Sequence, residues 1–237
     1  MYSSLQIKPL DSGSKKHPLK FPHLPNPAKG FRLCCIASSH SGKTTTICNM
    51  LLNEAFQYRS YYTPQKQHYP NIFIISPTCK DDPIWKRTIR ELKLPTSHIS
   101  TEYSDELVAK IRVYSKKAGG GLLILDDLIA NQSAMNSQKT TGVTEAFISG
   151  RHHLLSVILI SQIANKIPNG VRANTTNLMC WRLQNAAQER VFLDEFMVGV
   201  ENAKEKYMFA TRGSQYDFLY VDIPSRKCYC NFTKCLT

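Results

Sequence analysis

The feature that most constrains this chain is a loop of small residues between an apolar run and a segment with helical spacing of apolar residues. Residues 37–44 read Ala-Ser-Ser-His-Ser-Gly-Lys-Thr, which matches the phosphate-binding loop pattern except that Ala37 replaces its first glycine. The apolar run FRLCCIA precedes the loop, and TTTICNMLLNEAF follows it. Because this loop pattern requires a strand before it and a helix after it, we expect an α/β fold of the P-loop NTPase class.

The residue types of the loop have a chemical reason. Small side chains let successive backbone N–H groups surround a phosphate, and the N-terminus of the following helix adds its partial positive charge. Lys43 is expected to reach the β- and γ-phosphates of ATP, and the Thr44 hydroxyl to coordinate Mg²⁺. The predicted nucleotide-binding residues are Ser39, His40, Ser41, Gly42, Lys43, Thr44 and Thr45.

Two carboxylates, Asp126 and Asp127, directly follow the apolar run LLIL. The carboxyl end of such a strand lies beside the phosphate loop in an open α/β sheet, which makes Asp126 a Mg²⁺ ligand, directly or through water. Asp127 is then placed to polarise the attacking water. The separation between Lys43 and Asp126 has room for further elements, which predicts an additional strand between the two motif strands. An acidic turn after a core strand is the alternative when these residues are taken alone.

The next apolar run, residues 154–160, has one polar candidate at each end. Gln162 follows its carboxyl end, where an amide can sense the γ-phosphate or orient water, or merely cap the strand. Arg151 precedes its amino end, on the opposite edge from the chain's own nucleotide, so it could reach a nucleotide bound by a neighbouring subunit. A solvated arginine at a strand start is the alternative, and Arg172 is a second candidate for this role.

The net charge indicates what kind of partner the protein binds, and the cysteine content indicates the cellular compartment in which it works. The 237 residues include 30 Lys and Arg against 18 Asp and Glu, a formal net charge of +12, which indicates a polyanionic partner such as nucleic acid. No apolar run approaches the roughly 18 to 20 residues of a membrane span. The first residues lack the apolar region of a secretion signal, and the scattered cysteines suit reduced thiols. We therefore expect an intracellular protein that is not secreted and has no membrane span.

The chain divides into an extended, basic, proline-rich segment over residues 1–30 and one domain over residues 31–237. Asp82 and Pro83 are predicted to cap and start a helix. Helices are expected at 44–56, 82–92, 104–117, 186–196 and 201–209, and strands at 31–37, 71–77, 121–128, 153–162, 177–182, 217–223 and 227–232. Continuous apolar strands separated by helices predict a mostly parallel sheet with helices on both faces.

Taken together, the motifs resemble a known family. The segments ASSHSGKTTT, LLILDD, GRHHLLSVILISQ and IPNGVRANTTNLMCWR are similar to the genome-packaging ATPases of large double-stranded DNA viruses and virophages, the poxvirus-type branch of the FtsK/HerA superfamily. The resemblance covers roughly residues 25–196 and is most specific over residues 150–182. It implies a sheet in which the Gln162 strand separates the phosphate-loop strand from the acidic strand.

The resemblance also implies a function. The chain would form a homo-oligomeric ring around double-stranded DNA and use ATP hydrolysis to move that DNA into a preformed capsid, with capsid vertex proteins as further partners. The expected location is the host cytoplasm or a viral factory, or the virion. The implied roles are nucleotide and Mg²⁺ binding by Lys43 and Thr44, metal and catalytic acids at Asp126 and Asp127, a sensor at Gln162 and a trans-acting arginine at Arg151.

Other functions stay open. Asp127 stands where many superfamily members have Glu, so a nucleotide-switched DNA-binding protein without significant turnover is one alternative. A cellular DNA translocase or mobilisation ATPase would share the motor chemistry, and a nucleotide kinase would need an arginine-rich lid that the sequence does not show. Cys228, Cys230 and Cys235 lack the spacing of a zinc knuckle, so reduced thiols are favoured over a metal site.

Overall fold

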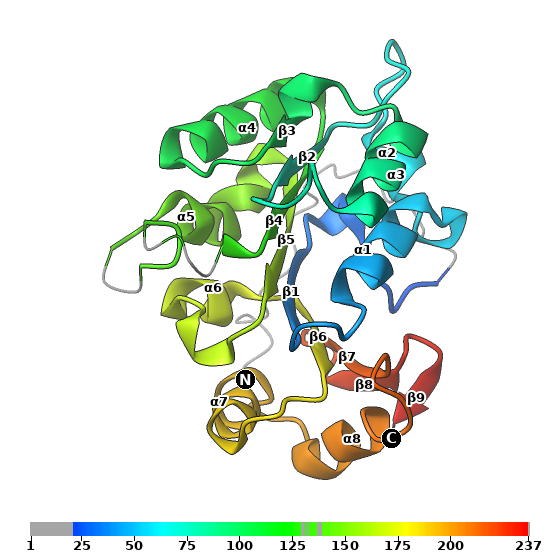
Figure 1. Cartoon of the computed structure of the whole chain (residues 1–237), viewed down its shortest axis with the longest axis vertical. Coiled ribbons are helices and arrows are strands. Elements are labelled where there is room, and N and C mark those ends of the chain that lie inside the picture. Colours follow the sequence, from blue (N-terminus) through cyan, green and yellow to red (C-terminus); the bar gives the residue numbers. More distant parts are fainter. Residues whose placement is uncertain (1–20, 129–130, 132, 137–138, 237) are drawn as a thin grey trace, which may run out of the picture.

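The continuous apolar runs lie side by side as strands of one sheet in this computed structural model, which describes residues 21–128, 131, 133–136 and 139–236 (Figure 1). The strands are β1 Arg32–Ile36, β2 Ile72–Ile75, β3 Ile99–Ser100, β4 Gly121–Asp126, β5 Leu155–Ser161, β6 Asn177–Trp181, β7 Phe218–Asp222, β8 Lys227–Cys230 and β9 Lys234–Leu236. Over the described ranges they form a nine-stranded sheet in the order β3-β2-β4-β5-β1-β6-β7-β8-β9. The strands from β3 to β6 in this order are parallel, and β7, β8 and β9 pair antiparallel.

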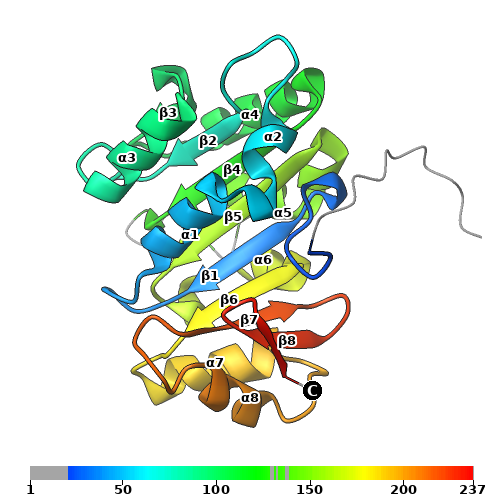
Figure 2. The same cartoon turned by 90° about the vertical axis from the view of Figure 1, so that its right-hand side faces the viewer.

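The centre of the sheet has the arrangement that the sequence predicts. β5 pairs with β1 on one side and with β4 on the other, so the Gln162 strand separates the phosphate-loop strand from the acidic strand (Figure 2). This confirms the additional-strand type of P-loop fold. Every residue of β4 and β5 is buried. Their uninterrupted apolar sequences follow from burial on both faces.

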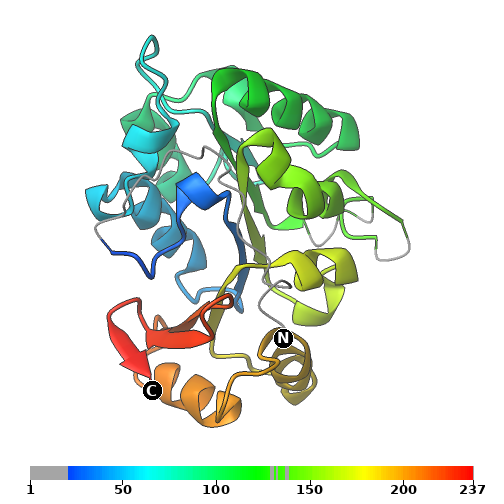
Figure 3. The same cartoon turned by 180° about the vertical axis from the view of Figure 1, so that it is seen from behind.

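Helices cover both faces of the sheet (Figures 1 and 3). Their bounds are α1 Lys43–Leu52, α2 Tyr58–Tyr62, α3 Pro83–Leu92, α4 Asp105–Ala118, α5 Gly142–Ser149, α6 Asn169–Asn174, α7 Ala186–Phe196 and α8 Ala203–Ala210. Helices α1 to α3 lie on one face of the sheet, and α4 to α7 lie on the other. Tyr207 of α8 packs into the hydrophobic core on the second face. Alternate residues of β1 belong to the two hydrophobic cores, with Leu33 in one and Cys34 in the other.

Local signals set several helix ends where the sequence predicts them. The Asp82 carboxylate accepts hydrogen bonds from the backbone N–H groups of Ile84 and Trp85, and Pro83 occupies the first position of α3. Ser104 caps α4 in the same way. The predicted helices over 82–92, 104–117, 186–196 and 201–209 are confirmed to within about two residues.

The predicted helix over residues 44–56 is wrong at its end. α1 ends at Leu52, because Asn53 adopts an extended conformation and its side chain caps a short 3₁₀ turn by accepting a hydrogen bond from Ala55 N. Gln57, with φ of 58°, then starts α2. The sequence analysis also missed the short elements α2, α5, α6, β3 and β9.

The predicted basic N-terminal segment is only partly described, since residues 1–20 lie outside the described residues. Residues 21–30 lie against the domain: Leu24 is buried, the Tyr58 hydroxyl donates to Pro25 O, and the Tyr220 hydroxyl donates to His23 O. The division at residue 30 stays a prediction. No helix in the described part of the chain has the length and apolar character that a membrane crossing requires.

Candidate active site

The phosphate-loop sequence forms an open loop between β1 and α1. Ala37 continues the strand, with its N–H donating to Ser161 O at 3.1 Å, and it has no positive φ, so alanine replaces the usual glycine without strain. Gly42 has φ of 80° and provides no side-chain cap for α1, which leaves the first N–H groups of that helix available to an anion. The buried Ser41 Oγ has no hydrogen-bond partner among the described residues.

Asp126 lies at the carboxyl end of β4 with only 3% of its surface exposed. Its Oδ2 accepts hydrogen bonds from the indole N–H of Trp85 at 2.9 Å and from the Ser76 hydroxyl at 3.3 Å. Burial raises the pKa of this carboxyl group and nearby Asp127 raises it further, while the Trp85 hydrogen bond and the Lys43 charge lower it. The effect of Lys43 shows that the phosphate loop and the acidic strand end lie close together.

Trp85 and Ser76 are site residues that the sequence analysis missed. Trp85 is a fully buried residue of α3 that packs in the core, and its indole N–H also fixes the Asp126 carboxylate. Ser76 directly follows β2, which neighbours β4. Only the strand order could have indicated that these residues meet Asp126.

The other predicted residues at this edge form a hydrogen-bond chain. Gln162, directly after β5, donates from Nε2 to Asp127 Oδ1 at 2.9 Å and accepts at Oε1 from the Ser39 hydroxyl at 2.9 Å. Asp127 has a positive φ of 55°, a bend that aspartate tolerates better than most residues. The structure thus joins the phosphate loop, the acidic motif and the predicted sensor through direct side-chain contacts.

Arg151 lies at the other end of β5. It belongs to the 3₁₀ turn Gly150–His153 before the strand, so it stands at the sheet edge opposite to the phosphate loop, as predicted. Its side chain is exposed and has no carboxylate partner in the described ranges of the chain. The second candidate, Arg172, forms an ion pair with Glu195 and a hydrogen bond with Asn169, so its guanidinium is engaged within its own chain.

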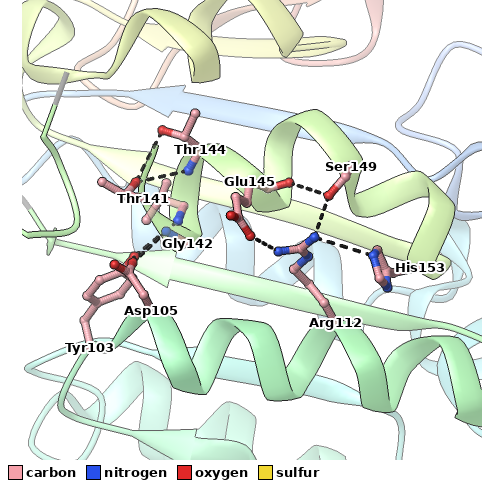
Figure 4. Close-up of polar contacts among 10 residues, drawn as sticks. Tyr103, Asp105, Arg112, Thr141, Gly142, Thr144, Glu145, Ser149 and His153 are labelled. Atoms are coloured by element: carbon pink, nitrogen blue, oxygen red, sulfur yellow. Dashed lines mark hydrogen bonds and ion pairs between the residues drawn. The ribbon is translucent and has the colours of Figure 1, made fainter. Parts of the chain in front are cut away.

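A polar network that the sequence analysis missed holds the turn of Arg151 (Figure 4). Arg112 of α4 forms an ion pair with Glu145 of α5 and donates to the Ser149 hydroxyl at 2.7 Å. Its second terminal nitrogen also lies 3.5 Å from His153 Nε2. Only 14% of the Arg112 side chain is exposed. The network therefore fixes the end of α5 and the turn that follows it.

A second set of contacts in Figure 4 fixes the start of α5 to the start of α4. The Asp105 carboxylate accepts hydrogen bonds from Gly142 N–H and from the Tyr103 hydroxyl, whose oxygen accepts from Val143 N–H at 3.2 Å. The helix is thus attached to α4 at both ends. In the sequence, α5 lies between Asp127 and Arg151.

The C-terminal cysteines form no metal-binding group with other described residues. Within residues 21–128, 131, 133–136 and 139–236, no group of three or more His, Cys, Asp or Glu side chains could hold a metal ion. Cys228, Cys230 and Cys235 are free thiols and belong to no such group. Burial raises the pKa of Cys228 to about 11, which keeps this thiol protonated at neutral pH.

The chain is similar to a known protein family and to several solved structures. Residues 20–221 match the poxvirus A32 protein family. A search of curated proteins found no match to the sequence.

The solved structures that resemble the chain include a viral packaging enzyme in several forms. The genome packaging NTPase B204 from Sulfolobus turreted icosahedral virus 2, in complex with AMPPCP, is 17% identical with a TM-score of 0.62, over 86% of this chain and 97% of that chain. The DNA-packaging ATPase B204 from Sulfolobus turreted icosahedral virus is 16% identical with a TM-score of 0.60, over 87% of this chain and 98% of that chain. At such identities the likeness shows the fold, and it confirms the predicted P-loop architecture.

Proposed function

The chain belongs to the poxvirus A32 protein family, and on this basis we propose that it is a motor that couples ATP hydrolysis to the movement of viral double-stranded DNA into a preformed capsid. The family match confirms the resemblance to genome-packaging ATPases predicted from the motifs. The observation that carries the proposal is the hydrogen-bond chain Ser39–Gln162–Asp127, because it brings the parts needed for phosphoryl transfer to one edge of the sheet.

The residues of this edge fit a nucleotide with Mg²⁺. The open N–H groups of α1 and the Lys43 ammonium suit the phosphates. The Thr44 hydroxyl and the Asp126 carboxylate supply oxygen ligands of the kind that Mg²⁺ prefers. Asp126 Oδ2 is already fixed by Trp85, and its Oδ1 accepts no hydrogen bond from a described residue. Bound Mg²⁺ would neutralise phosphate charge and offset the cost of burying Asp126.

Asp127 and Gln162 would handle the attacking water. Asp127 Oδ1 is positioned by the Gln162 amide, which leaves Oδ2 to accept a proton or a hydrogen bond from water. Because Asp is one methylene shorter than Glu, the water would sit closer to the backbone of Asp127. Gln162, which contacts both Asp127 and Ser39, can report a change at the γ-phosphate to both motifs.

The arginine that completes the site would come from a neighbouring copy of the chain. Arg151 is exposed on the edge opposite to its own nucleotide site, so it can act only on a nucleotide held by another subunit of a homo-oligomeric ring. The net charge of +12 suits contacts between such a ring and DNA phosphates, with little base specificity. Capsid vertex proteins remain the proposed docking partners.

Steady-state ATP hydrolysis, measured with and without long duplex DNA, tests the proposal. We expect DNA to raise the rate of the wild type, and Lys43→Ala to abolish it in both conditions. Lys66→Ala is the control, because Lys66 is an exposed lysine away from the site. ATP binding without turnover, with DNA and an assembled oligomer present, would instead support a nucleotide-switched DNA-binding protein. Hydrolysis that DNA does not change would contradict the motor.

A further inference from the structure

One exposed aromatic residue lies against the phosphate loop from a distant part of the chain. Tyr216 stands just before β7, and its Cδ1 lies 3.0 Å from the position that a Cβ on Gly42 would occupy. The ring therefore packs on the α-carbon of the residue that precedes α1. Even so, 59% of Tyr216 is exposed, so the ring presents surface to solvent at the edge of the proposed nucleotide site.

The strand order gives the direction in which a nucleotide would lie. Asp126, Asp127 and Gln162 follow β4 and β5, on one side of β1, so the γ-phosphate must point to that side. β6 and β7 are on the other side of β1 (Figure 2). With its phosphates on the loop and on α1, a nucleoside triphosphate extends its sugar and base away from the acids, toward Tyr216.

The backbone around Tyr216 is fixed before any ligand binds. The Tyr216 N–H donates to the Ser214 hydroxyl at 3.1 Å, and the Trp181 indole N–H donates to Tyr216 O at 3.1 Å. Asp217 holds the turn by accepting from Ser214 N–H at 2.7 Å and from the Asn231 amide at 2.7 Å. A ring on such a fixed turn loses little conformational entropy when a flat ligand covers it.

We propose that Tyr216 is the stacking surface for the base of the bound nucleotide and makes the site favour purine over pyrimidine triphosphates. This inference rests on the proposed function, since it concerns the same nucleotide. Stacking on an aromatic ring tolerates any base and is stronger for a larger one. We therefore expect ATP and GTP to bind with similar affinity, and UTP to bind more weakly than either.

Binding titrations of Tyr216→Ala, Tyr216→Phe and the wild type with ADP, UDP and inorganic triphosphate test the inference. We expect Tyr216→Ala to weaken ADP binding by about 5- to 100-fold, the range found when a stacking residue is replaced by alanine. Inorganic triphosphate, which has no base, should bind both proteins alike. Tyr216→Phe should retain the affinity for ADP. The preference for ADP over UDP should shrink in Tyr216→Ala.

Gln215→Ala is the matched control, because Gln215 is the exposed neighbour of Tyr216 on the same turn. Unchanged ADP affinity in Tyr216→Ala would overturn the inference. An equal loss of ADP and inorganic triphosphate would also overturn it, because the ring would then act by shaping the loop at Gly42. Steady-state hydrolysis by the wild type separates the two ideas: if the wild type does not hydrolyse ATP, the proposed function fails, whatever Tyr216 does to ADP binding.

Discussion

The two ends of β5 differ in how their polar residues are used. At the carboxyl end, Gln162 lies in a hydrogen-bond chain with Asp127 and Ser39, so both its amide nitrogen and its amide oxygen have a partner in the chain. At the amino end, Arg151 is exposed without a carboxylate partner among the described residues, although Arg112 fixes the turn that carries it. The polar side chains at the carboxyl end are thus bonded to one another, whereas Arg151 at the amino end has no carboxylate partner in the part of the chain that the structure describes.

The difference indicates which side chain of β5 is available to a neighbouring subunit. Holding the turn of Arg151 in one conformation lowers the entropy cost of placing that side chain against a partner. α5 joins the two ends, because the chain runs from Asp127 through α5 to Arg151 and returns along β5 to Gln162.

The largest expected effect on ATP hydrolysis comes from replacing Arg151, at the amino end of β5. Arg151→Ala should lower kcat for ATP hydrolysis by about 10³-fold, the lower end of what an arginine supplied to a γ-phosphate contributes. His152→Ala, which removes the exposed neighbour on the same turn, is the control and should retain the rate. Mixing Arg151→Ala with Lys43→Ala protein should restore hydrolysis, since each variant supplies what the other lacks.

A normal rate in Arg151→Ala would contradict a role in hydrolysis, because the exposed arginine would then be only a solvated residue. A loss of rate that mixing does not restore would mean that Arg151 acts within its own subunit or in assembly. Sedimentation of each variant with nucleotide and DNA separates assembly from chemistry.

The next largest effect on ATP hydrolysis is expected at the carboxyl end of β5, where Gln162 contacts Asp127. Asp127→Asn should lower kcat by about 10²-fold, because the amide cannot accept a proton from water. Gln162→Ala should lower it by about 10-fold through the loss of the hydrogen bond that holds Asp127. The double variant should be no slower than Asp127→Asn, since the two residues act as one unit. Additive losses in this double-mutant cycle would contradict the hydrogen-bond chain as a functional unit.

Local chemistry explains why much of the fold could be predicted from the sequence. The Asp82–Pro83 pair starts α3, and the short apolar run before Asp126, which follows glycines, forms a buried strand. The phosphate loop, the acidic strand end and the Gln162 strand end could be placed at one edge because parallel strands share a carboxyl edge. α5 was missed because its eight residues begin with a glycine and show little amphipathic pattern.

Contacts that depend on the order of the strands could not be predicted from the sequence. Trp85 meets Asp126 because α3 packs beside β4, and Tyr216 meets Gly42 because β6 and β7 follow β1 in the sheet. Neither pair has a local signal, since a buried tryptophan and an exposed tyrosine are each common. Arg112 was likewise indistinguishable from a solvated helix residue until α5 was placed beside it.

A smaller effect on ATP hydrolysis is expected from replacing Arg112, and it tests whether the Arg112 network positions Arg151. Arg112→Ala should lower kcat several-fold without changing the KM for ATP, and should lower Tm by about 2–4 °C for each kcal/mol lost. Arg112→Lys keeps the charge but not the two-pronged contact with Glu145 and Ser149, so it should recover part of the stability and little of the rate. The discriminating measurement is the mixing experiment with Arg151→Ala, whose intact nucleotide sites must take their arginine from the added subunit. The double variant Lys43→Ala/Arg112→Ala should restore hydrolysis there less well than Lys43→Ala alone does. Equal complementation would limit Arg112 to a role in stability.

The smallest expected effect is a gain in thermal stability when Asp126, at the carboxyl end of β4, is replaced by Asn. Burial raises the pKa of Asp126 above its ordinary value of 3.8, so ionising this carboxyl group costs more in the folded than in the unfolded protein. The cost is absent below pH of about 3.8 and grows as pH rises through the folded pKa. Asp126→Asn removes the charge and keeps an oxygen that can accept from Trp85 and Ser76. At pH 7 without nucleotide we therefore expect its Tm to rise by about 2–4 °C.

This gain should shrink as the solution is acidified, because both proteins are then uncharged at residue 126. Thermal unfolding at several pH values between 4 and 7 would measure the trend, and the same variant should lose ATP hydrolysis. A residue whose replacement stabilises the fold and abolishes turnover is retained for its chemistry. A lower Tm for Asp126→Asn at pH 7 would mean that the attraction of Lys43 and the hydrogen bonds from Trp85 and Ser76 outweigh burial. The Asp126 carboxylate would then stabilise the fold as well as serve the chemistry of the site.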